Sequence, residues 1–147
     1  AAKSTDCSSP RKWHYPPPTA ITQANLICRT SKSFVKKKAA LTLLRLYRKH
    51  PDIIQPQWAE RIVSLMDDPD FGVAVSVTSL VMAVAQDKLE QYRGAYVKAA
   101  SRLKRILIDG EVAPDYLYYK VPCPWLQIKL LRLLQYFPPS GKSPRPP

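Results

Sequence analysis

The feature that most constrains this chain is a regular spacing of apolar residues. Ala40, Leu43, Leu44 and Tyr47 recur at steps of three and four residues, which places their side chains on one face of an α-helix. Similar stripes follow along the chain, and prolines, which a helix interior does not tolerate, separate most of them. The pattern predicts an all-α fold of about five helices, over residues 34–50, 56–66, 70–86, 87–108 and 124–137.

Two of these helices have sequence features that bear on their type and start. Residues 70–86 are rich in valine, which also favours strands. About 17 residues without a turn signal exceed the usual length of a strand, so we predict a helix that is covered on more than one side. For the next helix, Asp87 and Glu90 have the spacing of a capping box. Its predicted apolar stripe consists of seven residues: Tyr92, Tyr96, Ala99, Ala100, Leu103, Ile106 and Leu107.

An internal repeat narrows the fold class. The segment Leu-Leu-Arg-Leu at 43–46 recurs at 130–133, and in both copies a proline stands five residues after the last leucine. The copies are 87 residues apart, which corresponds to two units of about 43 residues. Stacked helix hairpins of this length are typical of HEAT and armadillo repeats. We predict a HEAT/armadillo-like α-solenoid fragment, and because both end helices are largely apolar, we expect neighbouring repeats beyond this chain.

Composition divides the chain into three parts. The helical repeat segment covers residues 34–139, between a flank of Ser, Thr, Pro and basic residues at 1–33 and a tail at 140–147. We expect both flanks to be disordered. Half of the formal net charge of +12 lies in them, and the remainder is spread along the helices. Such a diffuse excess favours an acidic partner or an anionic membrane surface without identifying either.

The cysteines and histidines suggest no chemistry. Cys7, Cys28 and Cys123 have no paired spacing and no histidine nearby, so the sequence predicts neither a zinc site nor a disulfide framework. His14 and His50 have no carboxylate or nucleophile at an informative spacing. We predict that the chain is not an enzyme and binds no cofactor. No apolar run reaches the roughly 18 residues that span a bilayer, and a cytoplasmic location is expected.

An acidic cluster stands between the second and third predicted helices. Asp67, Asp68 and Asp70 lack the glycine and glutamate of a calcium loop. Helix capping is the expected role of all three, and no metal site is predicted.

Two stretches resemble the trunk of the adaptin family, the large subunits of clathrin adaptors. The first covers residues 35–52, VKKKAALTLLRLYRKHPD, and the second covers 115–139, DYLYYKVPCPWLQIKLLRLLQYFPP, which is most similar to the alpha adaptins. Residues 1–33 show no such likeness. The resemblance implies a scaffold in endocytosis and in intracellular, vesicle-mediated protein transport. It would bind the second large, the medium and the small adaptor subunits.

The same resemblance implies a location and indirect partners. An adaptin is expected in the cytoplasm, peripheral on the plasma membrane at clathrin-coated pits. It would reach the clathrin coat and the anionic membrane surface through the whole complex. The lipid-binding and cargo-reading residues of the family lie in other parts of its sequence, so no site residue is carried over.

Two basic sets are candidates for contact with anionic lipid or a partner. They are Lys36, Lys37 and Lys38 on the first helix, and Arg102, Lys104 and Arg105 on the fourth. Each basic residue near an anionic bilayer contributes on the order of 1 kcal/mol. The alternative is that each set is a solvated helix face.

Aromatic residues are the candidates for subunit contacts. Tyr116, Tyr118 and Tyr119 lie in the connection before the last helix, where core packing explains them less well. Trp58 and Trp125 are candidates for partner anchors, but their place on apolar stripes favours packing in the core.

Two other functions remain open at this point. The basic charge would suit an armadillo-type transport receptor or a nucleic-acid-associated solenoid. Such a protein calls for stacking aromatics or groove asparagines on successive repeats, which the sequence does not show, so we predict no nucleic-acid partner. The other alternative is a nonfunctional truncated product.

Overall fold

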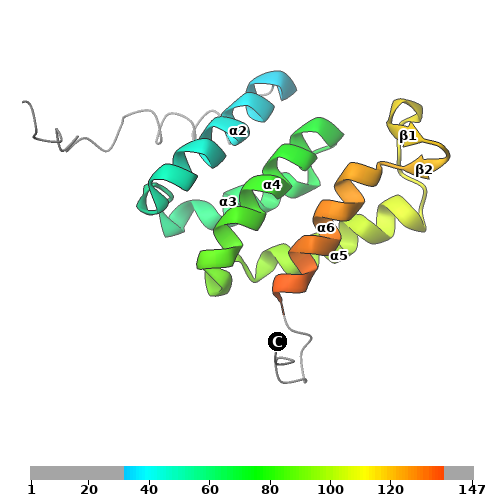
Figure 1. Cartoon of the computed structure of the whole chain (residues 1–147). Helices are drawn as coiled ribbons and strands as arrows, with labels where there is room; N and C mark the ends of the chain where they lie inside the picture. The colour runs from blue at the N-terminus through cyan, green and yellow to red at the C-terminus, as the bar shows by residue number, and fades with distance from the viewer. Residues whose placement is uncertain (1–31, 138–147) are drawn as a thin grey trace, which may run out of the picture.

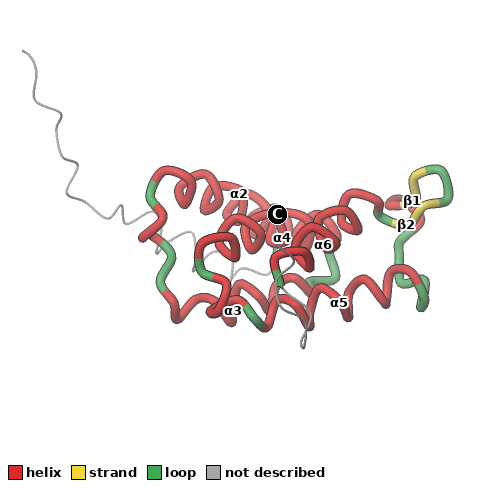
Figure 2. Tube along the Cα trace, turned by 60° about the horizontal axis from the view of Figure 1, so that its bottom comes forward, coloured by secondary structure: helices red, strands yellow, loops and turns green. Residues whose placement is uncertain are grey.

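The computed structural model describes residues 32–137, which form two layers of α-helices (Figures 1 and 2). One layer contains α2 (Ser33–Lys49), α4 (Phe71–Asp87) and α6 (Pro124–Tyr136). The other contains α3 (Ala59–Ser64) and α5 (Gly94–Leu107). Helix α4 packs between α2 and α6, and α5 lies beside α3 and beneath α6. Two helix hairpins and the first helix of a third are therefore stacked, which confirms the predicted all-α solenoid.

The valine-rich segment is the centre of the stack. It forms α4, as predicted, and five of its apolar side chains are fully buried: Val73, Val77, Leu80, Val81 and Val84. Neighbours on both sides and a second layer beneath it explain why this helix has almost no polar face.

The predicted helix over 56–66 is shorter and less regular than expected. Its α-helical part, Ala59–Ser64, lies between two 3-10 turns, Pro56–Trp58 and Leu65–Asp67. Pro56 stands at the first position of the opening turn, where its missing N–H would have no partner.

The predicted capping box at Asp87 is wrong. Asp87 is the last residue of α4, and its carboxylate accepts a hydrogen bond from the Tyr47 hydroxyl on α2. Glu90 lies in a 3-10 turn, Leu89–Tyr92, and α5 begins only at Gly94. A bond between two helices thus takes the carboxylate that a local cap would have used.

The predicted apolar stripe of the fourth helix is confirmed in part. Tyr92, Ala99 and Ile106 are buried and Leu103 packs against the core, whereas Tyr96 is 41% exposed. The buried residues of α5 are Ala95, Ala99, Arg102 and Ile106, whereas Leu107 is exposed. An arginine therefore occupies the buried face of this helix.

The connection before α6 contains a small hairpin that the sequence did not indicate. Strand β1 (Leu117–Tyr118) pairs antiparallel with β2 (Val121–Pro122). The two residues between them, Tyr119 and Lys120, have φ of 49° and 65°. Positive φ at both central residues is typical of a type I′ turn, which usually contains Asn-Gly. Neither residue type is present here, so the usual signal was missing.

Candidate interaction surfaces

Asp67 is the centre of an ion-pair cluster between the two hairpins. Its carboxylate accepts a hydrogen bond from Lys98 Nζ at 2.7 Å and another from the Arg105 guanidinium. Arg105 also lies 3.9 Å from a carboxylate oxygen of Glu111. Asp67 thereby joins the turn after α3 to α5, and helix capping does not account for it.

Asp68 makes the corresponding connection to α2. Its carboxylate accepts from Lys36 Nζ at 2.7 Å and from the backbone N–H of Asp70 at 3.0 Å. Of the three aspartates, only Asp70 caps a helix as predicted, because its side chain accepts from Val73 N at the start of α4. The acidic cluster is thus mainly a junction of α2, α4 and α5.

Arg102 completes this junction from within the protein. Its side chain is 5% exposed, and its guanidinium donates to the carbonyl oxygens of Asp67 at 3.3 Å and Asp68 at 3.1 Å. It also lies 5.0 Å from the ring centroid of Phe71. Burial, and then the nearby charge of Arg105, lower the pKa of Arg102. Two backbone carbonyls therefore hold a buried cation.

The six predicted basic residues divide into two groups. Lys36, Arg102 and Arg105 have the intramolecular partners given above, which occupy their charged groups. The exposed members are Lys37, Lys38 and Lys104. Lys38 Nζ lies 5.6 Å from the ring centroid of Phe34. Contact with anionic lipid or a partner stays a prediction for this set.

The expectation that Trp125 packs in the core is wrong. The buried stripe of α6 consists of Leu126, Leu130 and Leu133, so a residue directly before Leu126 lies on a different face. Trp125 is 63% exposed. Trp58, in contrast, is partly buried and packs against the core, as predicted.

The hairpin and the outer face of α6 form an apolar surface, which we call the open-end surface. The rings of Tyr118 and Tyr119 lie 4.7 Å apart, and Tyr118 lies 6.1 Å from Trp125. Tyr119 is 85% exposed. Ile128 and Leu131 continue the surface along α6, at three-residue steps from Trp125. Contiguous exposed apolar residues mark interaction sites.

Tyr116 lies at the inner side of the same region. Its ring centroid is 5.0 Å from that of Phe71, and 39% of the residue is exposed. The structure thus brings Tyr118 and Tyr119 together with Trp125, while Tyr116 contacts α4.

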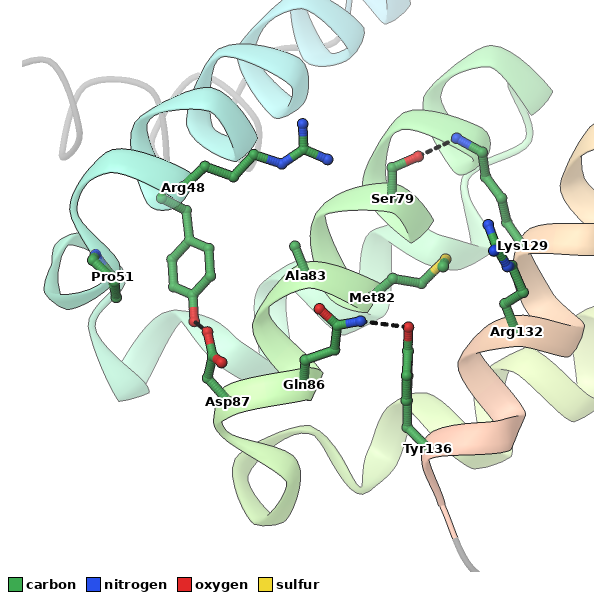
Figure 3. Close-up of a pocket in the computed structure, with 11 residues that line it drawn as sticks. Arg48, Pro51, Ser79, Met82, Ala83, Gln86, Asp87, Lys129, Arg132 and Tyr136 are labelled. Carbon is green, nitrogen blue, oxygen red and sulfur yellow. Dashed lines mark hydrogen bonds between the residues drawn. The ribbon is translucent and has the colours of Figure 1, made fainter. Parts of the chain in front are cut away.

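A polar groove that sequence reasoning missed lies over α4, between α2 and α6 (Figure 3). Its volume is about 490 Å³, and its lining includes Arg48, Met82, Gln86, Lys129 and Arg132. Gln86 Nε2 donates to the Tyr136 hydroxyl at 2.6 Å, and Lys129 Nζ donates to the Ser79 hydroxyl. Burial lowers the pKa of Lys129. The groove combines residues of three helices, so no local sequence signal indicates it.

The remaining candidates add no site. Within residues 32–137 no three His, Cys, Asp or Glu side chains lie close enough to hold a metal ion. None of the helices in that range is both long and apolar enough to cross a membrane. Cys123 is buried, which raises the pKa of its thiol. Cys7, Cys28 and His14 lie outside the described residues.

Comparisons with known proteins decide the family. The family model described as Adaptin N terminal region matches residues 22–146. The chain belongs to the adaptin family. This match extends beyond residues 34–139 on both sides, so the expectation that residues 1–33 show no likeness to the family is wrong for residues 22–33. It favours the adaptin interpretation over a transport-receptor solenoid.

Individual relatives identify the branch. The chain is 45% identical to AP-2 complex subunit alpha-2 of Dictyostelium discoideum over 124 residues, 84% of this chain and 12% of the relative. It is 44% identical to AP-2 complex subunit alpha-1 of Arabidopsis thaliana over 117 residues, 79% of this chain and 12% of the relative. Identity to AP-1 complex subunit gamma-1 of Mycosarcoma maydis is 29% over 109 residues, 72% of this chain and 12% of the relative.

The alpha adaptins are thus more similar to this chain than this gamma adaptin is, which confirms the resemblance to the alpha branch. The chain spans about 12% of the length of these curated relatives.

Proposed function

We propose that this chain is a scaffold segment of a clathrin adaptor complex and acts in endocytosis and vesicle-mediated protein transport by binding other proteins. The observation that carries the proposal is a stacked pair of adaptin-type hairpins that ends in an exposed apolar surface. Stacked repeats bury such a surface against the next repeat. The open-end surface therefore docks a further helix hairpin of an adaptin chain.

The polar side chains support a mechanism of binding without catalysis. The Asp67 carboxylate accepts from Lys98 on α5, and the Asp68 carboxylate accepts from Lys36 on α2. Arg102 donates to the carbonyl oxygen of Asp68. These bonds fix the angle between successive hairpins. A rigid stack presents an extended surface, and the second large, medium and small adaptor subunits bind along it. In this role the charged groups serve positioning rather than chemistry.

The location follows from the same assembly. The chain lies in the cytoplasm, peripheral on the plasma membrane at clathrin-coated pits, and it reaches clathrin and the anionic membrane surface through the whole complex. Of the six candidate basic residues, Lys37, Lys38 and Lys104 are exposed and available for a direct contribution. Tyr118 and Tyr119 are available for contact with a neighbouring subunit or repeat.

Co-purification tests the proposal. The tagged chain is co-expressed with the second large, medium and small subunits of the AP-2 complex, and the retained subunits are quantified by mass spectrometry. We expect the wild-type chain to retain them and the variant Tyr118→Ser/Tyr119→Ser to retain less. The control Val97→Ser changes an apolar residue, 67% exposed, on α5 and is expected to behave as wild type.

Retention of no adaptor subunit by the wild-type chain would contradict the scaffold proposal. Equal retention by the tyrosine variant and the control would contradict the role of the two tyrosines and leave the scaffold proposal in place.

A further inference from the structure

The outer face of α4 is recessed between its two neighbours. Ser79 and Ala83 are small, whereas α2 and α6 on either side carry long side chains toward the groove (Figure 3). Met82 and Ala83 provide an apolar floor. A depression of about 490 Å³ is within the range of ligand sites in proteins.

Cations line both walls of this depression. Arg48 comes from α2, and Lys129 and Arg132 come from α6. Arg48 and Arg132 are exposed, and neither forms an ion pair within residues 32–137. The one acidic residue of the lining is Asp87, whose carboxylate already accepts from the Tyr47 hydroxyl. The groove is therefore net positive, and its arginine donors have no protein partner in that part of the chain.

We propose that this groove binds an acidic peptide segment of a partner protein. Carboxylates of the peptide pair with Arg48 on one wall and with Arg132 on the other, because guanidinium groups bind carboxylates through two parallel hydrogen bonds. An apolar side chain between those carboxylates lies on Met82 and Ala83. Lys129 adds positive potential from the side of the groove.

The shape of the groove favours a peptide over other anions. A flat bilayer surface would meet the exposed arginines but not the half-buried Lys129 or the floor beneath it. An isolated phosphate would neutralise one wall and leave the apolar floor uncovered. Only a ligand with several negative charges and an apolar group matches the two cationic walls and the apolar floor together. The proposal concerns a site that the scaffold function does not require.

Fluorescence anisotropy with the full chain tests the site. The probe is a fluorescein-labelled peptide in which one leucine lies between two pairs of glutamates. The groove variant is Arg48→Glu/Arg132→Glu. The control is Lys32→Glu/Arg61→Glu, which changes two exposed basic residues outside the lining and alters net charge equally.

We expect the groove variant to bind the peptide at least about tenfold more weakly than wild type. The affinity of the control should stay within about threefold of wild type, because distant surface charges are screened. A glutamine version of the peptide is expected not to bind. Absence of binding to the wild-type chain would overturn the proposal, and so would equal losses in the groove variant and the control.

Two further probes separate the alternative ligands. Vesicles of phosphatidylcholine and phosphatidylserine, and inorganic phosphate, are each tested as competitors of the labelled peptide, and vesicle binding is also measured directly by co-sedimentation. Weak competition by both supports a peptide site. Tight vesicle binding that is lost in the groove variant, without peptide binding, would overturn the peptide proposal in favour of a membrane contact.

Discussion

Replacement of Arg102 by methionine tests whether the junction of α2, α4 and α5 holds the hairpins together. Methionine has a similar length but cannot donate a hydrogen bond. The change removes two bonds from a charged donor, to the carbonyls of Asp67 and Asp68, each worth about 1.5–3 kcal/mol. Relief from burying a charge offsets part of this loss. We expect Arg102→Met to lower the free energy of unfolding by about 3 kcal/mol, a large part of the total for a domain.

Urea unfolding of the full chain, followed by circular dichroism, measures the effect. With a slope of about 1.5 kcal/mol per molar, the midpoint falls by roughly 2 M. The matched control is Arg93→Met, which breaks an exposed ion pair with Glu90 at 3.2 Å and costs at most about 0.5 kcal/mol. Arg102→Lys keeps the charge but not the two-pronged donor, and its stability should lie between wild type and Arg102→Met. If Arg102→Met matched the control, the junction would not be what fixes the hairpins.

Three further predictions concern other parts of the chain. We expect the chain alone to self-associate through the open-end surface. Trp125→Lys/Leu131→Lys interrupts that surface and should reduce self-association in sedimentation velocity without loss of helix; unchanged self-association would argue that this surface is not adhesive. Burial raises the pKa of Tyr92 to about 12. The contribution of the Tyr92 side chain to stability is therefore complete below pH 10 and falls as the pH rises toward 12. In urea titrations Tyr92→Phe should lose less stability over that interval than wild type. Lys120→Gly should raise the free energy of unfolding by about 1 kcal/mol because φ at this position is positive; a decrease would show that the Lys120 side chain stabilises the hairpin.

The helices were predictable because their signals are local. The apolar steps around Leu43 and Leu130, with the prolines after them, define α2 and α6 without reference to any other element. The valine-rich segment needed only its length to be assigned to α4. The repeat spacing then gave the stacking, since hairpins of one length have few ways to bury their apolar faces.

The junction could not be predicted because its partners lie more than 30 residues apart in sequence. Asp67 and Arg105 are each ordinary charged residues until the hairpins stack. Arg102 did carry a signal, since it falls at helical spacing with Ala95, Ala99 and Ile106 on the buried face. Its charge made it a candidate for the surface instead.

Sequence-based prediction missed the open-end surface and the groove for different reasons. Trp125 was assigned to the core because apolar residues surround it on α6, where the true stripe begins one residue later at Leu126. The groove depends on Arg48 and Arg132 lining it from opposite sides of α4, and only the packed layer places them there.

Affinity purification of the endogenous tagged protein from native extract shows whether the chain is part of a clathrin adaptor complex. Proteins that copurify are identified by mass spectrometry after mild cross-linking. We expect the second large, medium and small subunits of the AP-2 complex in stoichiometric amounts, with cross-links near the open-end surface. Recovery of the protein without any adaptor subunit would show that it is not a scaffold of this complex.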